Sequence, residues 1–174
     1  GNHHPYMAPY GNYPCKGEDK WVSIAVKTGE EWQAFCHATG HSEWLQDERF
    51  YDLEKRLVNR DHLNRRVAEW TLNYAHYQAA ALLQEAGVAA APVLGIEEQY
   101  EDPHLKARGL YARCRHPLFG DETLLNIPWK LSRTPGSVRQ PAPLLGQHND
   151  YVLGEILGMS AGEIDKLLKE EALY

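Results

Sequence analysis

The hydrophobic pattern of residues 20–40 changes its period at Thr28, and this change constrains the fold more than any other feature of the sequence. Residues 20–26 are β-prone and turn mostly apolar, as in a strand that has one face against helices. Thr28 then opens a Thr-Gly-Glu-Glu capping box, in which side chains satisfy the backbone N–H groups at a helix start. Apolar residues follow at helical spacing as far as Gly40, which is placed as the C-terminal stop. A strand that leads directly into an amphipathic helix predicts a mixed α/β core.

The remaining sequence predicts further strands and helices of similar length. Pro92 places its predicted strand at a sheet edge or a bulge, because proline cannot donate to a sheet ladder. The predicted elements are a hairpin of 12–16 and 20–26, two or three helices within 47–87, a strand in 88–94, a helix from Asp102 to Gly109, and a second hairpin of 110–116 and 122–128.

Residues 132–143 are polar and rich in proline, which predicts an extended linker. Two amphipathic helices are predicted after it, separated by Gly158. We therefore expect an α+β protein: a small two-layer domain of antiparallel strands and packed helices over 1–131, a linker over 132–148, and a C-terminal helical segment over 149–174. Residues 1–11 form a loop that leads into the first hairpin.

Composition and charge exclude several functional classes. The 174 residues are 43% hydrophobic and 24% charged, as in globular proteins, and the formal net charge is −6. An acidic chain is a poor binder of nucleic acid, and no run of about 18 apolar residues predicts a membrane span. Cys15, Cys36 and Cys114 lie far apart, which favours a reduced cytoplasmic compartment.

Three motifs that can signal a site have a plainer explanation here. Residues 158–162 match Gly-x-Ser-x-Gly, but no strand precedes Ser160 and no histidine follows it, so we interpret Ser160 as a helix cap. His37 and His41 lack the glutamate of a zinc-protease helix, so we predict no metal site. Six basic residues alternate with acidic ones and are interpreted as a solvated helix face: Arg49, Lys55, Arg56, Arg60, Arg65 and Arg66.

Several blocks of the sequence, in order and with matching spacing, resemble the family III CoA-transferases. This family includes formyl-CoA, carnitine and succinyl-CoA-dependent transferases and the α-methylacyl-CoA racemases. The matching blocks are residues 1–11, 13–19 and 21–26, then 47–50, Asn59, 70–71, 86–93, 102–105, 108–109 and 145–149.

The resemblance implies that this chain is the C-terminal portion of a larger enzyme, and its start at Gly1 agrees with that expectation. In the transferases, an aspartate of the N-terminal half attacks the acyl-CoA thioester. We therefore expect no catalytic residue in this chain, no activity of the chain alone, and C-terminal helices that belong to a Rossmann-like large domain. The resemblance also implies acyl-CoA as cosubstrate, a carboxylic acid as acceptor, no permanent cofactor or metal, and an interlocked homodimer through which the linker threads.

The resemblance assigns the loop before the first hairpin to the acyl side of the active-site cleft. Its candidate residues are His4, Pro5, Tyr6, Met7, Ala8 and Pro9. Formyl-CoA transferases have a glycine run here, so these larger side chains predict a larger acyl group.

Two other functions stay open. The racemases place a carboxylate shortly after the second strand, where this chain has Thr28, which favours transfer over racemisation. A non-catalytic module that binds acyl-CoA or a partner protein would expose apolar surface on its last two helices.

Overall fold

The computed structural model describes residues 3–173 and divides into two compact units, Gly1–Gln99 and Tyr100–Tyr174. Both units contain antiparallel strands and helices, which confirms the predicted mixed α/β class. The first unit ends at Gln99, whereas the predicted domain boundary follows residue 131. The two strands of the second predicted hairpin pair with each other, and both lie in the second unit. The division into 1–131, 132–148 and 149–174 stays a prediction about the complete protein.

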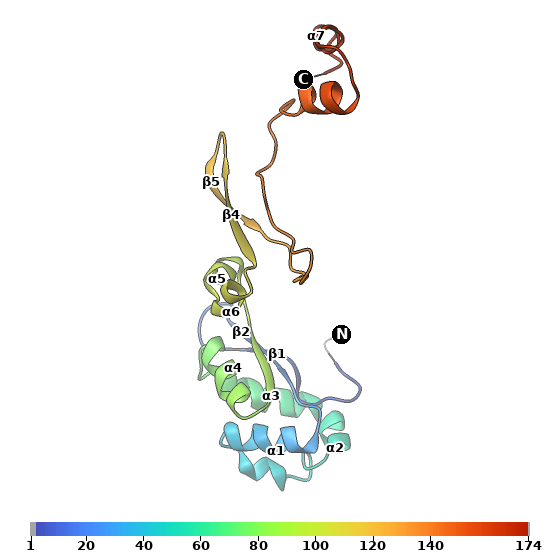
Figure 1. Ribbon diagram of the computed structural model, residues 1–174. Helices are drawn as coiled ribbons and strands as arrows, with labels where there is room; N and C mark the ends of the chain where they lie inside the picture. The colour runs from blue at the N-terminus through green and yellow to red at the C-terminus, as the bar shows by residue number, and fades with distance from the viewer. Residues whose placement is uncertain (1–2, 174) are drawn as a thin grey trace. The chain divides into compact units, whose positions relative to one another are not determined.

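The first unit contains a three-stranded antiparallel sheet in the order β1-β2-β3 (Figure 1). The strands are β1 (Tyr10–Pro14), β2 (Trp21–Ala25) and β3 (Ala89–Val93), so the first predicted hairpin and the edge position of Pro92 are confirmed. Tyr13 lies opposite Val22, and both side chains are buried, whereas their neighbours Asn12 and Ser23 are exposed. One face of the sheet therefore packs on helices and the other does not.

Five helical segments accompany this sheet, and three of them fall in the region 47–87 where two or three were predicted. They are α1 (Gly29–Ala38), the 3-10 helix η1 (Ser42–Leu45), α2 (Leu53–Val58), α3 (Arg60–Thr71) and α4 (His76–Glu85). The predicted capping box of α1 is confirmed. The Glu31 backbone N–H donates to Thr28 Oγ1 at 3.1 Å, and the Thr28 N–H donates to Glu31 Oε2 at 3.2 Å.

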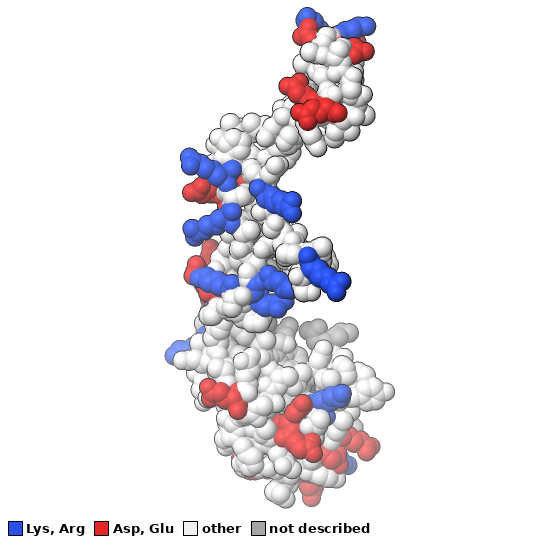
Figure 2. All heavy atoms as spheres, in the orientation of Figure 1, with Lys and Arg blue, Asp and Glu red and all other residues white. Residues whose placement is uncertain are grey.

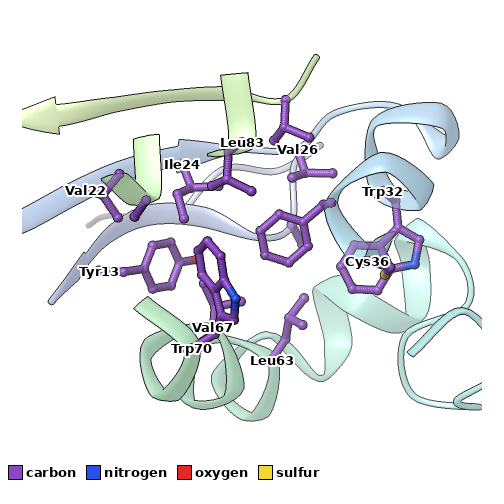
Figure 3. Packing of buried hydrophobic residues seen from close by; sticks show 14 of the residues in the cluster. Tyr13, Val22, Ile24, Val26, Trp32, Cys36, Leu63, Val67, Trp70 and Leu83 are labelled. Atoms are coloured by element: carbon purple, nitrogen blue, oxygen red, sulfur yellow. The ribbon is translucent and has the colours of Figure 1, made fainter. Parts of the chain in front are cut away.

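The core of the first unit is built around aromatic rings. The Trp32 ring stacks on Phe35 at 5.8 Å and on Trp44 at 6.3 Å between ring centroids. Figure 3 shows Leu63, Val67 and Trp70 of α3 on the same side of the sheet as Tyr13. These buried side chains fix α3 alongside β1, and that arrangement positions the site described below.

The second unit contains a two-stranded hairpin and short helices. The division between the units falls within the residues of helix α5 (Ile96–Glu101). The predicted helix that starts at Asp102 is α6 (Pro103–Ala107), and Asp102 caps it, because its Oδ1 accepts the Leu105 N–H at 2.9 Å. Strands β4 (Tyr111–His116) and β5 (Gly120–Leu125) confirm the second predicted hairpin. Strand β5 begins two residues earlier than predicted, at Gly120, whose φ of +79° forms the end of the turn.

Residues 126–144 contain neither helix nor strand, and the predicted linker residues 132–143 lie within this stretch. Two helical segments follow, the π-helical η2 (Asp150–Ile156) and α7 (Ala161–Lys169). Ser160 caps α7, as predicted: the Glu163 N–H donates to Ser160 Oγ at 3.3 Å, and Ser160 Oγ donates to the Glu163 carboxylate at 2.7 Å. No helix within residues 3–173 is both long enough and apolar enough to cross a membrane.

Candidate functional site

The loop before β1 has a buried end and an exposed end. Ala8 and Pro9 are buried. The Ala8 N–H donates to the Val26 carbonyl at 3.2 Å, and the Val26 N–H donates to the Pro9 carbonyl at 3.0 Å. These two bonds continue the pairing of β1 with β2 beyond the strands. Pro5 and Tyr6 are exposed, and 69% of the surface of Tyr6 is accessible. The exposed end of the loop therefore projects from an anchored base.

Arg56 of α2 anchors the buried end of the loop. Its Nε donates to the Ala8 carbonyl at 2.8 Å, its Nη1 donates to the Phe50 carbonyl at 3.2 Å, and its guanidinium lies 4.7 Å from the centroid of the Trp32 ring. Burial lowers the pKa of Arg56 to about 10, so the group stays charged at neutral pH. The interpretation of Arg56 as part of a solvated face was wrong. Only 2% of its surface is exposed, because its donors satisfy carbonyl groups inside the unit.

The middle of the loop is ordered by local contacts. The Tyr6 backbone N–H donates to His4 Nδ1 at 3.1 Å, and the His4 ring lies 5.0 Å from the Tyr10 ring. Half-buried Met7 lines a small cavity of about 10 Å³ together with Asn64 of α3. Of the six predicted loop residues, His4, Pro5, Tyr6 and Met7 are thus exposed or half-buried, while the side chains of Ala8 and Pro9 face the interior. Contact of this loop with substrate stays a prediction.

A groove lies next to the loop, between β1 and α3. Its volume is about 340 Å³, which is within the usual size range of small-molecule sites. No Asp or Glu is among its described lining residues. These residues are His3, Tyr10, Gly11, Asn12, Tyr13, Pro14, Asn64, Arg65 and Ala68.

Tyr13 and Asn64 form a hydrogen bond in the wall of this groove. Burial raises the pKa of Tyr13 above its ordinary value, so its hydroxyl keeps its proton. The Tyr13 hydroxyl donates to Asn64 Oδ1 at 2.8 Å. With Asn64 Oδ1 facing Tyr13, the Nδ2 group of the amide is left as a donor.

Sequence reasoning missed the contribution of α3 to this site. Arg60 and Arg65 were interpreted only as part of a solvated face, and Asn64 was not singled out. Arg65 is indeed exposed, yet it lines the groove, and Arg60 lines the small cavity beside Met7. The available signal was the row Arg60, Asn64 and Ala68, which repeats every four residues beside the core positions of α3.

The cysteine and histidine side chains of interest lie elsewhere in the fold. All three cysteines are free, and burial raises the pKa of the Cys36 thiol to about 12, so this thiol is not a nucleophile at neutral pH. His37 Nδ1 contacts Ser42 Oγ at 3.0 Å, and His41 Nδ1 contacts Glu43 Oε1 at 2.9 Å. Within residues 3–173, no group of three or more His, Cys, Asp or Glu side chains is arranged to hold a metal ion.

Comparison with known proteins identifies the class. The sequence pattern of CoA-transferase family III matches residues 1–149, and the chain belongs to this family. A probable CoA-transferase of Mycobacterium tuberculosis is 34% identical over 172 residues, which are 98% of this chain and 22% of that protein. Succinyl-CoA–D-citramalate CoA-transferase of Chloroflexus aurantiacus is 31% identical over 167 residues, 96% of this chain and 41% of that protein.

The solved structures give the same result. The crystal structure of a CAIB/BAIF family protein from Brucella suis matches with a TM-score of 0.75 and 26% identity, over 90% of this chain and 39% of that one. The chain therefore spans less than half the length of these relatives. The resemblance stated from the sequence blocks is confirmed.

Proposed function

We propose that the complete protein carrying this chain transfers CoA between carboxylic acids, and that His4 to Met7 form part of the wall on the acyl side of its cleft. Family membership supports the reaction class. Relatives include succinyl-CoA–L-malate and formyl-CoA:oxalate CoA-transferases, so the substrates of this class are carboxylic acids and their CoA thioesters. The single observation that supports the role of the loop is its construction, with Tyr6 exposed on a base that Arg56 anchors.

The nucleophile of this proposal is an aspartate outside the 174 residues. Its carboxylate oxygen attacks the thioester carbonyl, the C–S bond breaks, and CoA leaves as the thiolate, which produces a mixed anhydride of the aspartate and the acyl group. The thiolate then attacks the aspartyl carbonyl of the anhydride, which releases the donor acid and leaves an enzyme-CoA thioester. The acceptor carboxylate reverses these two steps and departs as the new acyl-CoA. CoA is thus a cosubstrate, and no permanent cofactor is needed.

The side chains of this chain support a nucleophile that lies outside the 174 residues. Ser160 could be considered as a nucleophile, but its hydroxyl is engaged in a helix cap. The Cys36 thiol keeps its proton at neutral pH, because burial raises its pKa to about 12. Thr28 Oγ1 accepts the Glu31 N–H at the start of α1, and this position carries no carboxylate that could move an α-proton, which favours transfer over racemisation. We further propose that the complete protein is a cytoplasmic interlocked homodimer, with the linker of residues 132–143 as the threading element.

The test is an assay of the complete protein with succinyl-CoA as donor and a panel of carboxylic acids as acceptors. We expect CoA transfer, and we expect Tyr6→Ala to lower kcat/KM by about tenfold, as for the loss of one packed substrate contact. Tyr51 is also exposed but lies outside the loop and the groove, so Tyr51→Ala is the matched control and should leave the rate unchanged. Exchange of the α-proton with solvent without transfer would contradict the proposal, and equal effects of the two variants would contradict the role of the loop.

A further inference from the structure

We infer that the groove between β1 and α3 binds a carboxylate, and that the proposed CoA transfer therefore acts on a dicarboxylic acyl group or acceptor. The inference rests on the proposed function for the reaction, but the site itself is argued from its own side chains. One carboxyl group would react beside the loop, and the second would lie in the groove.

The first argument is charge. Arg65 lines the groove and Arg60 lines the adjoining cavity, and neither forms an ion pair with any residue in 3–173. The neighbouring Arg66 behaves differently, because its Nη1 lies 3.7 Å from Glu69 Oε2. No carboxylate lines the groove on the protein side. Arg65 in the groove and Arg60 in the adjoining cavity, both without an ion pair, favour an anion, and a guanidinium matches the geometry of a carboxylate.

The second argument is the orientation of Asn64. The Tyr13 hydroxyl donates to Asn64 Oδ1 at 2.8 Å, so the oxygen of this amide faces Tyr13. The two hydrogens on Nδ2 then have no partner among the described residues. A fixed N–H donor beside a free arginine recognises an acceptor-only group such as a carboxylate.

The third argument is the continuity between groove and loop. The small cavity beside Met7 shares His3, Tyr10 and Asn64 with the groove. Its volume of about 10 Å³ is too small for a ligand, so it marks the packed junction between the two parts. A substrate in the groove would lie next to the loop, which is where the proposed function places the acyl group.

A binding experiment on this 174-residue chain tests the site without the reaction. Succinate is the probe and its neutral diamide, succinamide, is the control, each titrated while the Asn64 side-chain amide and the α3 backbone are observed by NMR. We expect succinate to shift these signals in a saturable way and succinamide not to do so. Arg65→Gln and Asn64→Asp should each raise the succinate Kd by about tenfold or more, because each removes or opposes a hydrogen bond to a charged group.

Arg66→Gln is the matched control for this experiment, since Arg66 is an exposed arginine on the same helix. It should leave the Kd within about twofold, as expected for an exposed charge with no ligand contact. Equal effects of Arg65→Gln and Arg66→Gln, equal shifts with succinamide, or no shift with succinate would each overturn the inference. Asn64→Asp keeps an acceptor for the Tyr13 hydroxyl, so a lost fold is not the expected cause of lost binding.

An activity experiment on the complete protein separates this inference from the proposed function. Succinate and butyrate are compared as acceptors, and Arg65→Gln should lower kcat/KM about tenfold for succinate but not for butyrate. Transfer with no such selectivity would overturn the carboxylate site and leave the proposed function standing. Succinate binding to the chain without any CoA transfer by the complete protein would overturn the proposed function and leave the site standing.

Discussion

The two units differ in where they keep their apolar side chains. The first unit buries a continuous cluster with Trp32, Phe35, Phe50 and Leu63 at its centre. Among the described residues of the second unit, Ile164 is the only buried hydrophobic one, whereas Phe119, Trp129 and Leu145 each expose more than 70% of their surface. Apolar burial is the main stabilising contribution to folding, so it stabilises the first unit more than the second.

Basic side chains are concentrated in one stretch of the second unit. Residues 103–148 contain seven Lys or Arg and only two acidic residues, Asp121 and Glu122, in a chain whose net charge is −6. Figure 2 shows the basic side chains over the hairpin β4–β5 and the extended segment that follows it. Only Lys106 of these seven forms an ion pair within the described chain, with Glu101 at 2.6 Å. The basic side chains of this stretch are therefore largely without acidic partners among the described residues.

The largest expected effect comes from removing one indole in each unit. Trp32→Ala should lower the free energy of unfolding by about 3–5 kcal/mol, because it leaves a cavity in the core. Trp129→Ala should change it by less than about 0.5 kcal/mol, because 71% of the Trp129 surface is exposed. Urea unfolding followed by far-UV circular dichroism measures both. Similar losses in the two variants would mean that the second unit has a core of its own.

An intermediate effect is expected from Arg56. Arg56→Ala should lower the free energy of unfolding by about 2–4 kcal/mol, because two buried carbonyl groups lose charge-assisted hydrogen bonds. Arg66→Ala is the control on the solvated side of the same unit and should cost less than about 0.5 kcal/mol, since its contact with Glu69 is exposed. Hydrogen exchange should also show faster exchange of the Ala8 and Val26 amides in Arg56→Ala. Protection that is unchanged there would contradict the anchoring of the loop.

The smallest expected effect is a pH dependence at the surface of the first unit. Hydrogen bonds from the Arg49 side chain hold the pKa of Asp47 at about 2, below its ordinary value of 3.8. Because the folded-state pKa is the lower one, the stabilisation is present above pH 3.8 and is lost as the pH falls from there towards 2. The loss should stay below about 1 kcal/mol because solvent screens the pair. Urea titrations of the wild type and Asp47→Asn between pH 5 and pH 2 measure it. An equal decline in both would assign the effect to other carboxyl groups.

Local patterns predicted the elements of both units. The Thr28 and Ser160 caps, the hairpins and the edge strand with Pro92 each depend on a few neighbouring residues, and the structure confirms them. The site could not be predicted in this way. The bond from Arg56 to Ala8 joins residues 48 positions apart, and the bond from Tyr13 to Asn64 joins residues 51 positions apart. Sequence periodicity shows that an arginine or asparagine lies on a helix, but only the packed fold shows which carbonyl or hydroxyl it meets.

The two borders of the three-stranded sheet have a consequence for the protein at high concentration. Pro92 lies in the outer strand β3 and offers no N–H to an incoming chain. On the opposite border, Thr71 Oγ1 donates to the Pro14 carbonyl at 2.7 Å, and the Lys16 N–H donates to the Tyr74 carbonyl at 2.8 Å, so part of that border is occupied by the end of α3 and the turn after it. Strand-by-strand growth of the sheet into fibrils is therefore hindered on both sides. Copies of this chain that self-associate would do so through the exposed apolar residues of the second unit. Such assemblies should dissociate when these residues are buried against another surface.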